Sequence, residues 1–252
     1  SAKLYPEDRG NDGNSSGKGF GDAVAISGNT LIVGAPEDES KGAKAGAVYI
    51  FERKDASSPW KQVKKLKGDR DDSFGTSVSI FGNYAAVGAP GNHSTYLYSK
   101  NSGAWTEFGG KLTQANTEFG ASVAIDNNHL VVGAPKKDVS GKQDVGAAYV
   151  YRHNGSTFSY QTQLTPSEPQ QEEHFGASVA LQADKIVLGA PQWDGVDEQG
   201  KSQGDQGRAF VFEGSGASWT RVARLTADGG LSPADASGEG NAGDEFGYSV
   251  AI

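Results

Sequence analysis

The sequence predicts an all-β fold, a β-propeller built from four-stranded antiparallel blades. One observation is a motif pair that recurs at a constant distance, and the other is a fixed order of short strands around each copy. Phe-Gly precedes a short apolar segment five times, at Phe20, Phe74, Phe119, Phe175 and Phe246. Gly-Ala-Pro begins 14 residues after each of the first four phenylalanines, although the five phenylalanines are spaced 54, 45, 56 and 71 residues apart. A constant segment joined by variable loops indicates a repeat protein.

The first two strands of each repeat surround this constant step. The first strand alternates small and branched residues, at 23–26, 77–80, 122–125 and 178–181. Tight turns follow at residue pairs that mostly tolerate a positive φ, namely Gly28-Asn29, Gly82-Asn83, Asn127-Asn128 and Ala183-Asp184. The second strand ends in Gly-Ala-Pro, because proline has no N–H to donate to a neighbouring strand.

Two further strands complete each blade. The third strand is rich in aromatic residues, at 48–51, 96–98, 148–151 and 209–212. The fourth combines an aromatic residue with a later leucine: Trp60 with Leu66, Trp105 with Leu112, Phe158 with Leu164 and Trp219 with Leu225. Because these four aromatic residues occupy equivalent positions, we expect them to pack rather than to bind a ligand. The predicted blades cover approximately 20–68, 74–114, 119–166 and 175–227.

The ends of the chain predict incomplete blades. Residues 1–6 resemble the close of a fourth strand, and residues 246–252 resemble a first strand with no Gly-Ala-Pro after it. We therefore expect residues 1–252 to form a single propeller region that is part of a larger ring, with the rest of a longer polypeptide as partner. The alternative is completion by neighbouring units.

Composition favours a soluble extracellular β protein. The 252 residues include 36 glycines, which suit many tight turns, and no cysteine, which excludes disulfides and thiolate metal sites. A net charge of −8 argues against nucleic-acid binding, which requires a basic face. No apolar run approaches the roughly 18 residues of a membrane-spanning helix, so we expect no membrane insertion within the chain.

The Phe-Gly and Gly-Ala-Pro pairs resemble the FG-GAP repeats of the integrin α-chain N-terminal propeller, from about Phe20 to Ile252. The resemblance implies a β-propeller with an adhesion or ligand-binding role, secreted or on a cell surface. Many integrin-type repeats hold calcium in an Asp-rich loop between the first and second strands. Here those connections, 27–30, 81–84, 126–129 and 182–185, are too short and too poor in carboxylates. The usual calcium loops are therefore absent, and no cofactor is firmly predicted.

Calcium binding elsewhere remains an expectation for two acidic segments. The first contains Asp194, Asp197, Glu198 and Asp205. The second contains Asp235, Glu239, Asp244 and Glu245. The alternative interpretation is that both are ordinary solvated loops, because runs of charge usually face water.

Loop lengths indicate where a ligand would bind. The loops after the second and fourth strands are mostly long and emerge on one face, which we call the long-loop face: 37–45, 136–145, 192–207 and 227–245. Variable loops on a rigid scaffold are where recognition usually occurs. Trp193 breaks the repeat pattern, so we predict ligand binding by Trp193, Asp194 and Asp197, unless Trp193 folds back over its blade. Tyr248 is a further candidate, with packing as its alternative.

Other motifs give little information about function. Gly13 to Gly17 matches a nucleophile-elbow pattern without the required strand and helix, and the four histidines lack ligand spacing. No catalytic residue is predicted. In a eukaryotic secretory pathway Asn14, Asn92 and Asn154 would be glycosylation acceptors.

The main functional hypothesis is a non-enzymatic recognition or adhesion module that binds a protein or glycan through the long-loop face. One alternative is a propeller hydrolase or lyase acting on polysaccharide, with carboxylates as acid and base. Another is a structural spacer in a larger surface protein.

Overall fold

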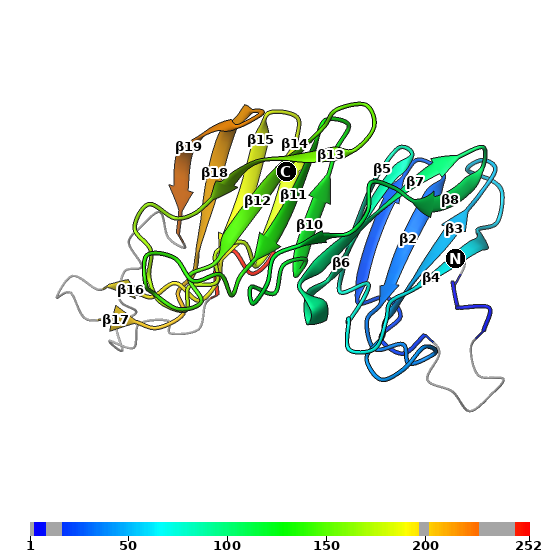
Figure 1. Cartoon of the computed structure of the whole chain (residues 1–252), viewed down its shortest axis with the longest axis horizontal. Coiled ribbons are helices and arrows are strands. Elements are labelled where there is room, and N and C mark those ends of the chain that lie inside the picture. Colours follow the sequence, from blue (N-terminus) through cyan, green and yellow to red (C-terminus); the bar gives the residue numbers. More distant parts are fainter. Residues whose placement is uncertain (1–2, 9–16, 197–201, 227–244) are drawn as a thin grey trace. The chain divides into compact units, whose positions relative to one another are not determined.

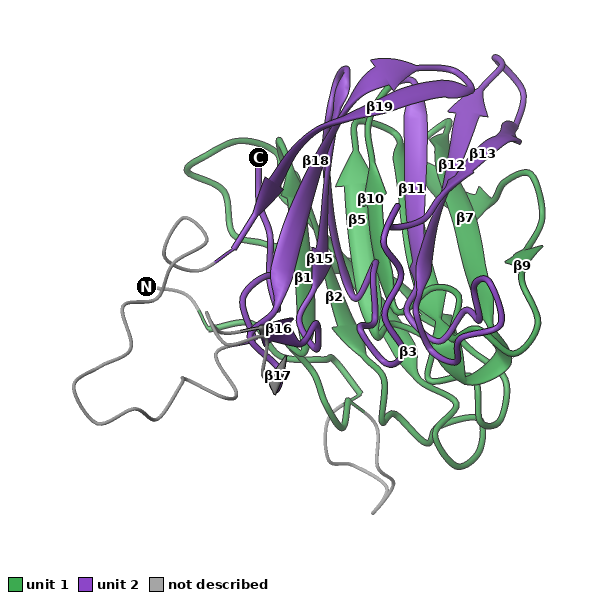
Figure 2. Ribbon diagram, turned by 90° about the vertical axis from the view of Figure 1, so that its left-hand side faces the viewer, with its two compact units in different colours: residues 1–127 green, residues 128–252 purple. Residues whose placement is uncertain are grey.

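The computed structural model describes residues 3–8, 17–196, 202–226 and 245–252. The chain divides into two compact units, residues 1–127 and 128–252, which are coloured green and purple in Figure 2. The regular secondary structure of the described residues consists of strands and one short 3₁₀ turn, η1 (Pro90–Asn92). None of the helical structure described is long and apolar enough to cross a membrane.

Unit 1 contains the first two repeats and the first strand of the third. Repeat 1 forms the sheet β1 (Ala23–Ser27), β2 (Thr30–Ala35), β3 (Ala47–Glu52) and β4 (Lys61–Lys67), in that spatial order and antiparallel. Repeat 2 follows the same order with β5 (Ser77–Phe81), β6 (Tyr84–Ala89), β7 (Ser94–Asn101) and β8 (Ala104–Glu107). The first strand of the third repeat, β10 (Ser122–Ile125), packs against β5 and β6.

Unit 2 contains β11 (His129–Ala134) and the strands that follow it (Figure 1). The third repeat supplies β11, β12 (Ala147–His153) and β13 (Phe158–Leu164). The fourth forms β14 (Ser178–Gln182), β15 (Lys185–Ala190), β18 (Arg208–Ser215) and β19 (Ser218–Leu225). A short hairpin of β16 (Gly195–Val196) and β17 (Ser202–Gln203) lies in the loop between β15 and β18. Each repeat thus contributes four antiparallel strands, which confirms the predicted all-β propeller-type fold.

Three predicted strands differ from the structure. The fourth strand of repeat 2 is split, because Gly109 and Gly110 adopt positive φ between β8 and β9 (Leu112–Thr113); both pieces pair with β7. The segments predicted as terminal strands, 1–6 and 246–252, are not assigned as strands over their described residues, and Phe246 forms only an isolated bridge with Gly207.

The constant 14-residue step has a direct hydrogen-bonding explanation. In three repeats the glycine of Phe-Gly donates its N–H to the carbonyl of the glycine in Gly-Ala-Pro. The distances are 3.0 Å from Gly21 to Gly34, 2.9 Å from Gly75 to Gly88 and 2.8 Å from Gly176 to Gly189. This bond closes the hairpin formed by the first two strands. The number of residues between Phe-Gly and Gly-Ala-Pro is therefore constant, whereas the other loops vary in length.

The glycine of Gly-Ala-Pro is required for a second reason, the close approach of the next repeat. A Cβ on Gly88 would lie 1.9 Å from the carbonyl oxygen of Gly120, and one on Gly34 would lie 2.0 Å from that of Gly75. The Ser77 hydroxyl donates to the same Gly120 oxygen at 2.8 Å. The Phe-Gly at Phe74 therefore closes its own hairpin through Gly75 and also docks on the preceding repeat at Gly34.

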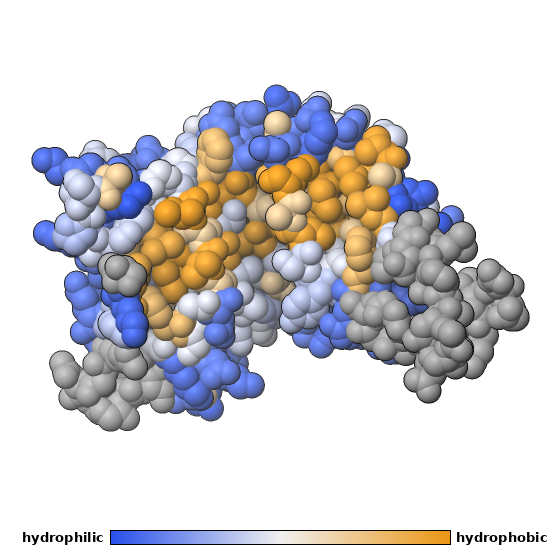
Figure 3. Space-filling view, turned by 180° about the vertical axis from the view of Figure 1, so that it is seen from behind, coloured by the Kyte–Doolittle hydropathy of each residue, from blue (hydrophilic) through white to orange (hydrophobic). Residues whose placement is uncertain are grey.

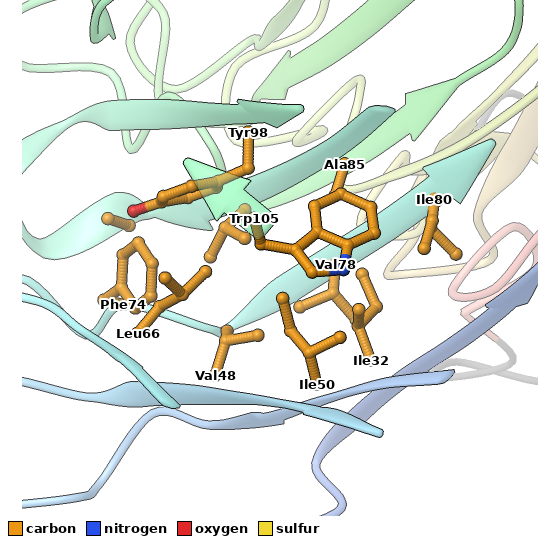
Figure 4. Close-up of a cluster of buried hydrophobic side chains, with 12 residues drawn as sticks. Ile32, Val48, Ile50, Leu66, Phe74, Val78, Ile80, Ala85, Tyr98 and Trp105 are labelled. Carbon is orange, nitrogen blue, oxygen red and sulfur yellow. The ribbon is translucent and has the colours of Figure 1, made fainter. Parts of the chain in front are cut away.

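The phenylalanine of each internal motif fills the core. Phe74 is fully buried and meets Tyr96 and Tyr98 of β7 edge to face, with ring centroids 5.2 and 6.3 Å apart. It belongs to the apolar cluster of Figure 4, which joins repeats 1 and 2 and includes Ile50 and Trp105. The predicted packing role of the equivalent outer aromatic residues is confirmed, since Trp105 and Phe158 are buried and Trp60 and Trp219 pack against clusters.

Packing between repeats buries apolar side chains of the first strand in repeat 2, whereas the equivalent side chains of β1 are exposed. Val78 and Ile80 of β5 are buried against repeat 1, with 9% and 7% of their surface exposed. Their counterparts in repeat 1, Val24 and Ile26, remain 63% and 59% exposed. Apolar side chains also gather on the face shown in Figure 3. Apolar residues that are covered in one repeat are thus accessible in another.

Candidate binding site at the loop end of unit 2

The candidate site lies in the long loop between β15 and β18, at the end of unit 2 where β16 and β17 are found in Figure 1. Trp193 is half-buried, and the guanidinium of Arg208 lies over its ring, 4.9 Å from the centroid. The Trp193 carbonyl accepts a hydrogen bond of 3.0 Å from the Gly207 N–H. The loop is therefore tied together where it leaves β15 and where it enters β18.

Asp194 is exposed beside this tryptophan, and hydrogen bonds fix both its backbone N–H and its carboxylate. Its N–H donates to Gln170 Oε1 at 3.1 Å, and its Oδ1 accepts from the Asp205 N–H at 3.0 Å. The structure thus brings together Asp194 and Asp205 of the predicted calcium set. Asp197 and Glu198 lie outside the described residues, as do Asp235, Glu239 and Asp244. Among the residues that are described, no cluster of three metal-ligating side chains forms.

Tyr248 follows a segment that pairs with the end of the same loop. Phe246 donates its N–H to the Gln206 carbonyl at 3.0 Å, and Glu245 donates to that of Asp205 at 2.9 Å. The Tyr248 side chain is 72% exposed. Three predicted binding residues, Trp193, Asp194 and Tyr248, therefore belong to connected backbone segments of unit 2.

The arginine that stacks on Trp193 belongs to a buried ion pair with Glu173. Arg208 is 1% exposed and Glu173 is fully buried, and Arg208 Nη2 donates directly to Glu173 Oε2. Arg208 also donates to the Glu168 carbonyl at 3.0 Å, and Glu173 Oε1 accepts from the Gln170 N–H at 3.2 Å. Burial raises the pKa of the Glu173 carboxyl, and the attraction of Arg208 opposes this shift. The pair fixes the segment that contains Gln170, which in turn binds Asp194.

Buried carboxylates organise the corresponding loops of unit 1 as well. Asp72 accepts from the Asp69 N–H at 2.7 Å, from Asn92 Nδ2 at 2.5 Å and from the Tyr96 hydroxyl at 3.2 Å. Asp72 and Glu173 occupy the same position, two residues before Phe-Gly. Both acids are visible in the sequence when the alignment of the repeats extends two residues upstream of Phe-Gly.

Asp38 forms the third such centre, in repeat 1. Its Oδ2 accepts from the Gly17 N–H at 2.6 Å, the Tyr49 hydroxyl at 2.9 Å and Lys65 Nζ at 3.0 Å. Burial alone would raise the pKa of Asp38, but hydrogen bonds from Ser40, Gly17 and Lys65 outweigh it and lower the pKa to about 2.

This shift predicts acid sensitivity. The folded pKa of about 2 lies below the usual aspartate pKa of 3.8, so Asp38 stabilises the fold above about pH 4 and loses this contribution as the pH falls toward 2. The difference corresponds to about 2 kcal/mol. We expect the free energy of urea unfolding to fall less between pH 5 and pH 2.5 in Asp38→Asn than in the wild type. An equal fall in both proteins would contradict this assignment.

The potential glycosylation acceptors have different environments. Asn14 lies outside the described residues. The amide nitrogen of Asn92 is engaged by Asp72, as described above. Asn154 is exposed in the turn between β12 and β13, where its Oδ1 accepts from the N–H groups of Ser156 and Thr157, both at 3.0 Å.

Comparison with known proteins agrees with the repeat geometry. The family model for the FG-GAP repeat matches residues 2–51, 60–105, 113–151 and 158–212, which together make up most of the chain. The chain belongs to the FG-GAP repeat family. A search of curated proteins finds no match.

Solved structures similar to this FG-GAP chain are distant in sequence. A crystal structure of a protein from Lactobacillus plantarum is 12% identical, with a TM-score of 0.53 over 82% of the chain. The chain spans 56% of the length of that protein. The structure of YjhT is 14% identical, with a TM-score of 0.46 over 86% of the chain and 67% of YjhT. At such identities the first comparison supports the fold alone.

Proposed function

We propose that this FG-GAP chain is a non-enzymatic recognition module that binds a protein or glycan through the loop end of unit 2. The observation that supports this most directly is the fixed pair of Trp193 and Asp194. Arg208 stacks on the indole, and backbone hydrogen bonds hold both residues in a loop that does not repeat elsewhere in the chain.

Preorganisation is the physical reason to expect binding here. Ordering a loop and its side chains costs free energy that reduces affinity, and this loop is already tied to Gly207, Gln170 and Asp205. An aromatic ring offers a surface for apolar faces of a sugar or a side chain, and the Asp194 carboxylate accepts hydrogen bonds from hydroxyl or amide groups. Exposed Tyr248 adds a second ring on the adjoining segment.

Recognition also fits the use of the buried acids better than catalysis does. The carboxylate oxygens of Asp72 and Glu173 accept hydrogen bonds from backbone N–H groups and from side chains within their own repeats. A general acid and base must instead reach a substrate. We further propose a secreted or cell-surface location with a role in adhesion, as the FG-GAP repeats suggest. The experiment below tests whether binding requires calcium.

The test is an array of glycans and extracellular-matrix proteins, probed with wild-type protein in the presence of calcium and of a chelator. For the ligand found, we expect the double variant Trp193→Ala with Asp194→Ala to lose about 2 kcal/mol of binding free energy, roughly 30-fold in Kd, as for a typical hot spot.

The matched control is Trp60→Ala. Trp60 is also half-buried and also stacks with an arginine, Arg53, at 4.6 Å, but it lies in unit 1. Binding should be unchanged in this variant. Unchanged affinity in the double variant would refute the site, and turnover of a polysaccharide on the array would refute the non-enzymatic role.

A further inference from the structure

Unit 2 has a second candidate site at the end opposite its β16–β17 hairpin (Figures 1 and 2). A hollow of about 410 Å³ opens there beside the β12–β13 hairpin. Its lining consists of Arg152, His153, Asn154, Ser159 and Gln161. No carboxylate is among these residues, although the chain has a net charge of −8.

Arg152 is distinguished by its lack of partners. Within the described part of the chain, the other arginines bind an acid or a polar side chain: Arg53 binds Asn29, Arg70 binds Asp71, Arg208 binds Glu173, Arg221 binds Ser167 and Arg224 binds Glu168. The Arg152 side chain makes neither a hydrogen bond nor an ion pair with any described residue, although its backbone in β12 pairs with the neighbouring strands. Its five N–H donors are therefore available in a hollow without acids, which is the arrangement that suits a planar anion.

The neutral side chains of the hollow are held in place. Gln161 Nε2 donates to the carbonyls of Ser159 and Tyr160, at 3.1 and 3.0 Å, and so presents its Oε1 away from the strand. Asn154 Nδ2 donates to Ser159 Oγ at 3.1 Å. Hydroxyl and amide groups in fixed positions are suited to binding the hydroxyl groups of a ligand.

The turn between β18 and β19 forms a neighbouring wall. A methyl group built on Gly216 would lie 4.0 Å from Arg152 Nη1 and 3.8 Å from Gln161 Oε1. Gly216 has a φ of 56°, which favours glycine. The absence of a side chain at this point keeps the hollow beside Arg152 open.

We propose that this hollow binds an acidic saccharide, with the carboxylate of a hexuronic acid on Arg152 and sugar hydroxyls on Gln161 and Asn154. A single guanidinium matches one carboxylate, whereas phosphate sites usually combine several cationic groups or a helix N-terminus. The remaining lining is rich in neutral polar groups, which match a polyhydroxylated ring. The site is separate from Trp193 and does not depend on the function proposed above.

The test is calorimetric titration of the whole chain with a hexuronic acid disaccharide, a neutral hexose disaccharide, acetate and inorganic phosphate. We expect the hexuronate to bind about tenfold or more tightly than each of the other three, and Arg152→Ala to weaken it by about tenfold or more. Arg152→Lys should give an intermediate loss, because the charge remains but the planar fork is lost.

Two variants serve as controls. Arg224→Ala removes the same charge from an exposed arginine elsewhere in unit 2 and should bind the hexuronate like the wild type. The Trp193→Ala with Asp194→Ala variant should also bind normally, which separates this site from the loop end. Equal affinity of Arg152→Ala and the wild type would overturn the proposal, as would equal binding of phosphate or the neutral disaccharide.

Discussion

Glu173→Ala is expected to lower the free energy of unfolding by about 3–5 kcal/mol, because it leaves the Arg208 guanidinium buried without its counter-ion. Arg208 is 1% exposed, so water cannot replace the lost carboxylate without opening the loop. The Gln170 N–H loses its acceptor at the same time. Urea unfolding followed by tryptophan fluorescence would measure the loss.

The control is the neutral pair Glu173→Gln with Arg208→Met. Replacing a buried ion pair by uncharged residues of similar volume is often close to neutral, so this double variant should be more stable than Glu173→Ala. The third repeat supports this expectation, because it has Thr117 and Ala147 at the equivalent positions. The blade therefore does not require the pair. A double variant no more stable than the single one would contradict this explanation.

Phe74→Ala is expected to destabilise unit 1 by about 3–5 kcal/mol, the usual cost of removing a buried phenylalanine ring. The ring is fully buried between repeats 1 and 2, where it meets Tyr96 and Tyr98. Its loss would leave a cavity in the cluster of Figure 4, because the backbone at Gly75 is fixed by hydrogen bonding to Gly88. Thermal and urea unfolding both report this loss.

The same change in the first motif is a matched control. Phe20 makes similar edge-to-face contacts, with Tyr49 and Phe51 at 5.4 and 6.1 Å, but it is only half-buried. Because less apolar surface is returned to water, Phe20→Ala should cost less than half as much as Phe74→Ala. Equal losses would show that contacts within one repeat, and not burial between repeats, determine the contribution of the motif.

Much of the fold could be predicted because its signals are local. The turn at Gly28, the strand end at Gly-Ala-Pro and the alternation in 77–80 are properties of a few adjacent residues, and each repeats. Prediction was less accurate where pairing depends on distant residues. The fourth strand of repeat 2 is an example, because it is split into β8 and β9, and both pieces pair with β7.

The candidate sites were predictable only in part. Trp193 could be identified because it departs from the repeat, yet its stacking on Arg208 depends on a loop that brings together residues 15 positions apart. No sequence pattern identified Arg152 as a binding residue. An arginine on a strand is ordinary in a sequence, and its lack of partners is a property of the surrounding side chains.

The sequence by itself determined the repeated blade and the step that defines it. Single residue types meet the backbone requirements of this step. Gly75 adopts a positive φ, Gly88 has no side chain where the next repeat approaches, and Pro90 has no N–H to donate. The tertiary structure decided what Phe-Gly does between repeats and which charges are buried or left unpaired. Burial and ion pairing arise from contacts between residues far apart in the chain, so they exist only after folding.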